Sequence, residues 1–447
     1  MPSEIEIRIP ANNILERKYV ANYIFDDFLG IKTNIIIDEQ IENYEIIFET
    51  KKVIILDAFF SFNVDNFTYL NISNLPKITW AKNQFLKELN IPILYGTSKM
   101  EFIGNSIVCG IDIFASVFFM LTRWEEHVCI VRDKYERFPG VESIAYKNNF
   151  LHRPIVNEYI EMLWNILVYI GYKEKRKYRR FELILTHDID FIFNAFNPFR
   201  IIVGDIVKRK SLRLAFSRLP AFFRNYTDTY DFLMDVSESV GIKSHFYFMA
   251  SDQRKDLHDT PFYLNTKKFR DIILKIRKRG HVIGFHPGYQ TFENEGIWKE
   301  EREKLEKVLE GQVFEGRQHC LRMNIIKTLT IWDNQGMQLD STLGYADVEG
   351  FRCGTGDLFP VFDFSHRKIL NVSECPLILM DVSLKNYRNL TNEELALVLR
   401  QYIDVGKKYN MPITWLFHNS SFDIWKWKGL KEIYKETIQG CVNKSAK

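Results

Sequence analysis

The sequence predicts an α/β chain of two domains: a distorted (β/α)7-type barrel preceded by a smaller N-terminal α/β domain. Its length of 447 residues exceeds what one hydrophobic core usually holds. From Phe181 onward, strand-like and helical patterns alternate over about 250 residues, which is typical of a parallel sheet or barrel. Polar side chains follow those strands, as they do at the catalytic edge of a barrel. We therefore divide the chain into residues 1–176 and 177–447.

The N-terminal domain combines short strands with two helices and has no evident role. Apolar runs predict strands at 33–37, 44–48 and 53–56, and amphipathic patterns predict helices at 112–127 and 154–169. Pro154 lies in the first turn of the second helix, where a missing N–H does no harm. The basic run at 173–180 is interpreted as a solvated linker, with a nucleic-acid or membrane patch as the alternative.

The second domain shows seven strand-like runs rather than eight. They start near residues 182, 244, 281, 313, 337, 370 and 412, and helices are predicted at 230–240, 266–279, 297–309, 324–334 and 391–409. The last helix opens on Thr391 and Glu394, the spacing of a capping box. A glycine follows each of the other four helical runs, where a left-handed terminator is expected: Gly241, Gly280, Gly311 and Gly336.

Composition predicts an ordinary globular protein of the cytoplasm. The hydrophobic share is 46%, the charged share is 26% and the net charge is +3, so there is no general case for nucleic-acid binding. We expect no signal peptide, and no apolar run approaches the roughly 18 residues that span a bilayer. The six cysteines have no Cys-x-x-Cys spacing, which indicates reduced thiols rather than a structural zinc site.

The candidate site begins at residues 183–190, where a buried strand runs into His187, Asp188 and Asp190. The two aspartates are two residues apart, so on an extended backbone they face the same side. A turn with an Asx cap is the alternative. Further polar residues end the later strands: Ser251 and Asp252, His286, Arg317 and His319, Asp340, Asp381, and His418 with Asn419.

These residue types are suited to metal-assisted hydrolysis. Aspartate and histidine are ligands of zinc and other divalent metals that keep positions open for water and substrate. A further carboxylate can take the proton of water, and an imidazole can protonate the leaving group. No Gly-x-Ser-x-Gly elbow, phosphate-binding loop or dinucleotide fingerprint is present.

Three motifs resemble the polysaccharide deacetylases of carbohydrate esterase family 4, the NodB-homology superfamily. They are THDID at 186–190, GHVIGFH at 280–286 and TWLFH at 414–418, and the resemblance covers roughly 181–425. Residues 286–289, 317–319, 340–345 and 350–355 are similar to a subgroup with an extra N-terminal α/β domain that is associated with surface polysaccharides.

The resemblance implies a role for each matching residue. Asp188 would be the catalytic base and Arg317 the group that orients it. Asp190 and His286 would be metal ligands, and His418 would be the general acid. On a regular strand His187 points away from the two aspartates, so it is interpreted as a packing residue or a group behind the ligands, and His281 is interpreted as structural.

One departure concerns the metal. The family pattern places a second histidine ligand at position 290, where this chain has Gln290. We favour a rebuilt site in which His319, at the next strand end, supplies the missing nitrogen. The alternatives are a weak or absent metal, and a His319 that is buried and bonded to backbone. The expected metal is zinc.

The remaining predictions concern substrate and surroundings. Substrate contacts are predicted for Gln290, Arg322, Asp340, Tyr345, Arg352 and Asn419. The glycine-rich segment 352–356 is expected to form a loop, either plain or holding an anionic sugar or phosphate. The aromatic and basic segment 191–226 is expected to be a lid, a peripheral contact with membrane or lipid-linked glycan, or helices packed on the barrel.

The function predicted from the sequence is removal of acetyl groups from an N- or O-acetylated sugar in surface polysaccharide metabolism by a metal-dependent hydrolase. A catalytically degenerate glycan-binding member of the same fold is one alternative, and a hydrolase of another non-peptide C–N bond is a second. The location is expected to be cytoplasmic, with peripheral membrane contact through 191–226. The N-terminal domain could also serve as an assembly surface.

Overall fold

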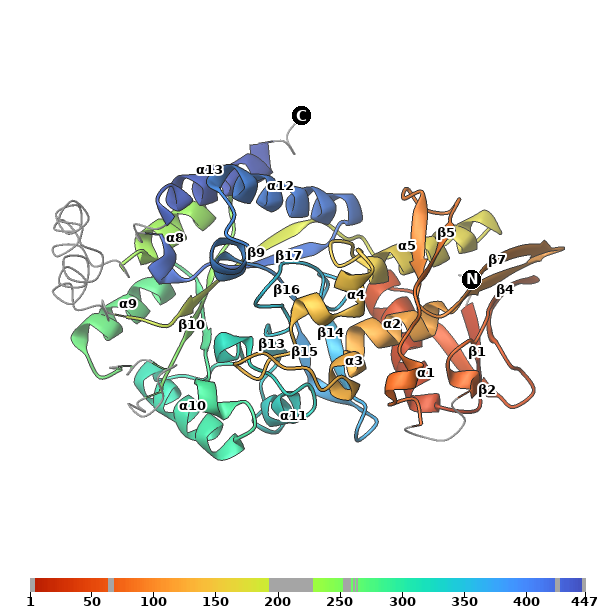
Figure 1. The fold of residues 1–447 in the computed structure, drawn as a ribbon, viewed down its shortest axis with the longest axis horizontal. Coiled ribbons are helices and arrows are strands. Elements are labelled where there is room, and N and C mark those ends of the chain that lie inside the picture. Colours follow the sequence, from red (N-terminus) through yellow and green to blue (C-terminus); the bar gives the residue numbers. More distant parts are fainter. Residues whose placement is uncertain are drawn as a thin grey trace. The chain divides into compact units, whose positions relative to one another are not determined.

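The computed structural model describes residues 5–62, 68–192, 228–251, 259, 262, 264–422 and 427–443, which form two compact units (Figure 1). Unit 1 comprises Met1–Glu182, Met323–Ile378 and Gly406–Pro412, and unit 2 comprises Leu183–Arg322, Leu379–Val405 and Ile413–Lys447. Residues 323–378 thus group with the N-terminal segment, whereas the division of the chain at 176 stays a prediction. Of the predicted contact segment 191–226, all but Phe191 and Ile192 lie outside the described residues.

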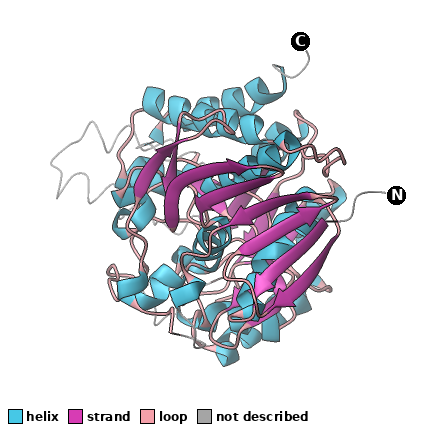
Figure 2. Cartoon of the chain, turned by 90° about the vertical axis from the view of Figure 1, so that its right-hand side faces the viewer, coloured by secondary structure: helices cyan, strands magenta, loops and turns pink. Residues whose placement is uncertain are grey.

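Unit 1 contains a six-stranded mixed sheet whose strands face the viewer in Figure 2. Its order is β2 (Thr33–Asp38), β1 (Ile5–Pro10), β3 (Tyr44–Phe48), β4 (Lys51–Ile55), β8 (Ser106–Ile111) and β7 (Gly96–Ile103). Alternate residues of β1 and β3 are buried, as expected for strands with one face on a core. On that core side Tyr44 stacks on Phe114 at 4.1 Å between ring centroids.

The other elements of unit 1 include a hairpin, several helices and three later strands. The hairpin joins β5 (Thr79–Lys82) to β6 (Asn90–Ile93). The helices are α1 (Ile14–Asn22), α2 (Ile113–Thr122), α3 (Trp124–Val128), α4 (Ile144–Lys147), α5 (Ile155–Tyr169) and α11 (Lys327–Asn334). Strand β15 (Lys368–Glu374) pairs parallel with β13 (Leu339–Asp340) and antiparallel with β14 (Phe359–Asp363).

The helix predicted at 112–127 is interrupted at Arg123, which takes a left-handed conformation (φ 53°) between α2 and α3. The side chain of Arg123 is buried and donates hydrogen bonds to three oxygen acceptors. Its guanidinium donates to Glu125 and Glu126 at 2.8 and 3.0 Å, and to the Tyr345 hydroxyl at 2.9 Å. The break directs this charge into a buried network, which helical periodicity alone does not reveal.

The same network holds residues 340–356 against the N-terminal segment within unit 1. Arg352 makes two hydrogen bonds to Glu126, and its third nitrogen donates to the Gly344 carbonyl at 2.6 Å. Backbone bonds of 2.8 Å from Phe351 to Leu151 and of 2.9 Å from Val156 to Gly354 continue the contact. These interactions explain why residues 323–378 belong to unit 1.

Unit 2 is built on neighbouring strands in the order β12 (Glu315–Gly316), β11 (Val282–Phe285), β10 (His245–Phe248), β9 (Glu182–Ile189), β17 (Pro412–Leu416) and β16 (Leu377–Met380). The pairs β9–β10, β10–β11 and β11–β12 are parallel. Helices α8 (Tyr230–Glu238), α9 (Lys267–Lys278), α10 (Glu295–Leu309), α12 (Asn392–Tyr409) and α13 (Leu430–Asn443) accompany them (Figure 1).

The helix ends mostly follow the predicted signals. Gly241, Gly280 and Gly336 have positive φ. The prediction for Gly311 is wrong, because Glu310 (φ 50°) takes the left-handed position at the end of α10. The capping box of α12 is confirmed: the Thr391 N–H donates to Glu394 at 2.8 Å, and the Glu394 N–H donates to the Thr391 hydroxyl at 3.2 Å.

Removing that cap should have a modest effect on stability. We expect Thr391→Ala to lower the free energy of unfolding by about 1 kcal/mol, because the Glu394 N–H loses its acceptor. Chemical denaturation of the full chain measures the change. Thr391→Ser keeps the hydroxyl and should retain most of the stability; equal loss in both variants would contradict the capping explanation.

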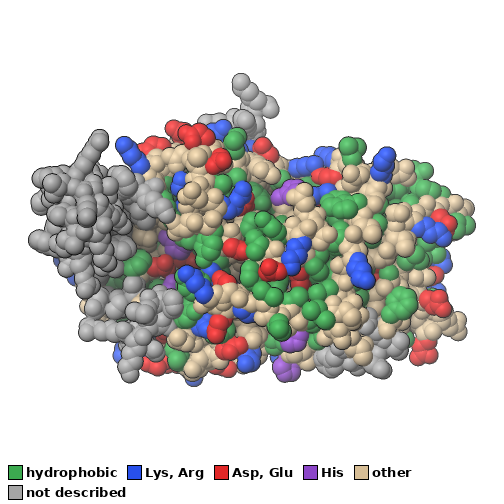
Figure 3. All heavy atoms as spheres, in the orientation of Figure 1, with side chains coloured by type: hydrophobic (Ala, Val, Ile, Leu, Met, Phe, Trp, Pro, Cys, Tyr) green, Lys and Arg blue, Asp and Glu red, His purple; other side chains and the backbone are tan. Residues whose placement is uncertain are grey.

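The surface carries both signs of charge. Basic and acidic side chains are interspersed over the face drawn in Figure 3, in line with the net charge of +3. Among the described residues, no helix has both the length and the apolar character needed to cross a membrane.

Candidate functional site

Four strand ends of unit 2 bring together the predicted catalytic and metal-binding residues. Asp188 and Asp190 lie at the end of β9, His286 follows β11, Arg317 and His319 follow β12, and His418 follows β17. Parallel strands place their carboxyl ends at one edge, and this register explains the convergence of residues that are up to 230 positions apart.

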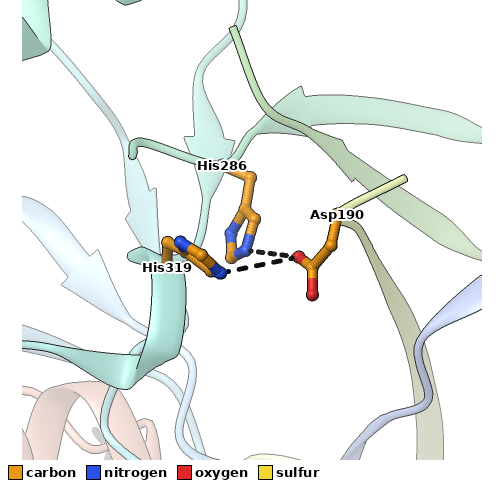
Figure 4. Close-up of side chains that lie close together, drawn as sticks. All are labelled: Asp190, His286 and His319. Atoms are coloured by element: carbon orange, nitrogen blue, oxygen red, sulfur yellow. Dashed lines mark ion pairs between the residues drawn. The ribbon is translucent and has the colours of Figure 1, made fainter. Parts of the chain in front are cut away.

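Asp190, His286 and His319 form a cluster with the geometry of a metal site. One ligand atom from each lies within 4.8 Å of the other two. Both histidines turn Nε2 toward Asp190 (Figure 4), and the distances to Asp190 Oδ1 are 3.3 Å from His286 and 3.9 Å from His319. The rebuilt site favoured from the sequence requires this arrangement. Gln290 is exposed on the short helix Tyr289–Thr291.

The tautomer of His286 fits a bound cation. His286 Nδ1 lies 2.5 Å from the Arg317 carbonyl oxygen, which can only accept, so Nδ1 carries the proton. In the neutral ring, Nε2 then has a buried lone pair that faces Asp190 Oδ1. A proton or a metal ion can lie between these two atoms, and a neutral imidazole beside a carboxylate fits a divalent metal.

Asp190 is held in its charged form. Burial would raise the pKa of Asp190, but the hydrogen bond with His286 and the charges of His418 and His319 outweigh burial and lower the pKa below its usual range. The Asp190 carboxylate is therefore ionised near neutral pH, which is the form that binds a metal.

Arg317 contacts Asp188, the predicted base. Its guanidinium donates to Asp188 at 2.9 Å and to the Thr186 hydroxyl at 2.8 Å, and both charged side chains are buried. The other oxygen of Asp188 lies 3.8 Å from His286 Nε2. Asp188 is therefore fixed beside the cluster without occupying it.

His418 and Asp381 form a second charged pair at the same edge. His418 Nδ1 lies 2.8 Å from Asp381, and Nε2 lies 3.8 Å from Asp190. Burial lowers the pKa of His418, but the charge of Asp381 and the hydrogen bond to it outweigh burial and raise the pKa to about 10. At neutral pH the imidazolium can therefore donate a proton.

Asp381 and Asp259 are functional candidates that lacked an assigned role in the sequence. Asp381 accepts hydrogen bonds from the His418 N–H and from Ser421 in addition to the ring. Its position directly after an apolar run was a usable signal. Asp259 lies 2.7 Å from His319 Nδ1, and nothing in its local pattern indicates this.

The two histidines interpreted as packing or structural residues, His187 and His281, are not part of the cluster. His187 is buried, with Nδ1 bonded to the Phe417 carbonyl at 2.8 Å, and burial lowers its pKa to about 4. His281 accepts from the Ser244 N–H at 2.9 Å and contacts Glu238. Both interpretations are confirmed.

Two of the predicted substrate residues in unit 2, Arg322 and Asn419, contact other residues of the unit. Arg322 stacks between Tyr289 and Phe292, at 4.1 and 3.7 Å from the ring centroids, and donates to the Tyr289 carbonyl at 2.9 Å. Asn419 is buried and donates to the Phe191 carbonyl at 2.9 Å. Substrate contact by these residues and by Gln290 stays a prediction.

The other three predicted substrate residues lie in unit 1. Asp340 accepts from Thr342 and is buried beside Glu374, while Tyr345 and Arg352 belong to the network around Glu126. Segment 352–356 is bound to residues 151–156 by the backbone bonds described above. Their role in binding substrate likewise stays a prediction.

Comparison with known proteins gives partial matches. A family of unknown function (DUF7033) matches residues 5–171. No curated protein matches the chain. The chain is similar to a candidate polysaccharide deacetylase from Mycobacterium smegmatis (14% identity, TM-score 0.38), with 58% of this chain and 84% of that chain covered.

Two further solved structures are similar in part. One is a mutant CE4 family pseudoenzyme with restored enzymatic activity (8% identity, TM-score 0.31), with 60% of this chain and 64% of that one covered. The other is Agd3, a novel carbohydrate deacetylase (9% identity, TM-score 0.36), with 66% and 54% covered. The function of this chain has to be inferred from its own residues.

Proposed function

We propose that this protein is a metal-dependent hydrolase that removes acetyl groups from an N- or O-acetylated sugar in surface polysaccharide metabolism. The observation that carries the proposal is the cluster of Asp190, His286 and His319 beside two separately anchored groups, Asp188 and His418. Its motifs resemble those of carbohydrate esterase family 4, and the same residues meet in space. We also propose a cytoplasmic location.

Asp188 and His418 would each carry out one proton transfer of the reaction. Water attacks the acetyl carbon, and Asp188, fixed by Arg317, accepts the proton that water loses. The bond from that carbon to the sugar nitrogen or oxygen breaks, and His418 donates a proton to the departing atom. Acetate and the deacetylated sugar are the products. A divalent metal at the cluster, with zinc as the proposed ion, would polarise the acetyl carbonyl.

Metal content and acetate release of the full chain test the proposal. We expect stoichiometric metal by mass spectrometry in the wild type, and loss of that metal in Asp190→Ala and His286→Ala. The exposed His366, which pairs with Asp363 in unit 1, offers a matched control, and His366→Ala should keep the metal.

Acetate is assayed with N-acetylated and O-acetylated oligosaccharides. Release by the wild type supports the deacetylase. Glycan binding without release would favour the degenerate, non-catalytic alternative. A wild type that holds no metal and is unchanged by either cluster substitution would overturn the metalloenzyme proposal.

A further inference from the structure

Asp259 lies behind His319, on the side of the ring away from the cluster. Its Oδ1 is 2.7 Å from His319 Nδ1, while His319 Nε2 faces Asp190. Asp259 is 8% exposed, so this contact is protected from water. The His286 ring is oriented in the same way, with Nε2 facing Asp190, but its Nδ1 donates to the backbone carbonyl of Arg317. The two ligand rings are thus anchored by different kinds of acceptor, one neutral and one charged.

The carboxylate of Asp259 is itself fixed by the turn that follows His286. Both of its oxygens accept from the Tyr289 N–H, at 3.0 and 3.1 Å. The preceding Gly288 has no room for a side chain, because a Cβ would lie 2.7 Å from Asp259 Oδ2 and 2.9 Å from Glu301 Oε1. Glu301 in turn accepts from the Gly288 N–H at 2.8 Å. One carboxylate therefore links His319 to the turn after His286.

The backbone after His319 is strained, and the surrounding contacts maintain it. Cys320 and Leu321 have φ of 59° and 53°, a left-handed conformation that costs roughly 1–2 kcal/mol for each such residue. The His319 N–H donates to the Pro287 carbonyl at 3.1 Å, which ties the strained turn to the same 287–289 segment. Strain of this kind persists where the structure over-determines a functional position.

We propose that Asp259 is a positioning residue for His319: it holds Nδ1–H so that Nε2 is directed at the metal. The inference rests on the proposed metal site. A carboxylate behind a ligating imidazole fixes the ring and raises its basicity, and loss of such a partner typically costs 10- to 100-fold in metal affinity. In this chain the carboxylate supports the ligand that substitutes for the histidine missing at Gln290.

Zinc affinity of the full chain tests this inference by competition with a chromophoric chelator, a readout that does not involve activity. We expect Asp259→Ala to weaken zinc binding about 10- to 100-fold. Asp259→Asn is isosteric and can still accept from Nδ1–H, so it should recover part of the affinity. Asp381→Asn removes the carboxylate behind His418, which is not a proposed ligand, and zinc affinity should stay near that of the wild type.

Each outcome decides between the proposals. Wild-type affinity in both Asp259 variants would overturn the role of Asp259 and leave the metal site standing. Equal weakening in Asp381→Asn would also overturn it, because the effect would not be specific to His319. A wild type that binds no zinc would overturn the proposed metal site itself. If Asp259→Ala fails to fold, as judged by circular dichroism, Asp259→Asn decides the question.

Discussion

His418→Ala should lower kcat for acetate release by roughly 100- to 10,000-fold while the metal content stays unchanged. The imidazole is the proposed proton donor to the leaving atom, and its pKa of about 10 keeps it protonated at neutral pH. Its Nε2 lies 3.8 Å from Asp190, on the oxygen that does not face His286 and His319. Steady-state kinetics with metal-loaded enzyme measure the loss.

The companion variant Asp381→Asn tests the charge of Asp381 separately from the presence of the His418 imidazole. It keeps an acceptor for His418 Nδ1 but removes the negative charge that raises the pKa of the imidazole. We expect kcat to fall by less than in His418→Ala, with the basic limb of the pH profile moved to lower pH. An unchanged kcat in His418→Ala, with metal retained, would exclude this histidine as the general acid.

The second large effect concerns stability. Glu126→Ala should lower the free energy of unfolding by about 3–5 kcal/mol, because it leaves Arg123 and Arg352 buried without a shared carboxylate. Glu126 lies 2.9 Å from Arg352 Nε and 3.0 Å from Arg123 Nε, and all three side chains are at most 5% exposed. The charges of Arg352 and Arg123 outweigh burial and lower the pKa of Glu126.

An exposed ion pair in the same unit provides the control. Glu142 pairs with Lys147 at 2.6 Å, but both side chains are more than one third exposed. Glu142→Ala should therefore change stability by less than about 1 kcal/mol. Guanidinium unfolding of the full chain measures both variants, and similar small losses at Glu126 and Glu142 would show that the buried network is not a main support of unit 1.

Much of the secondary structure follows from local patterns. Each of the seven predicted strand starts lies within two residues of an observed strand, because apolar runs bounded by turn residues are local signals. Strands β1, β5, β6, β7 and β8 of unit 1 were not predicted, and neither were β14 and β16. The latter, Leu377–Met380, has only four residues and no alternation that would distinguish a strand from a short buried segment. The (β/α)7 count of the barrel stays a prediction.

The cluster of Asp190, His286 and His319 could be anticipated because all three residues end or follow parallel strands. The division into two compact units could not be anticipated, because residues 323–378 carry the same strand–helix alternation as their neighbours. Their grouping with unit 1 depends on partners such as Arg352 and Glu126, which are 226 positions apart. Periodicity contains no information on such pairs.

By itself, the sequence determined where strands and helices form and which strand ends carry carboxylates and imidazoles, because both depend on residues that are close along the chain. Only the tertiary structure decided which group lies behind each histidine: Asp259 for His319, Asp381 for His418 and the Arg317 carbonyl for His286. Those partners come from loops and strand ends 31 to 60 residues away, and they meet only once the core has packed.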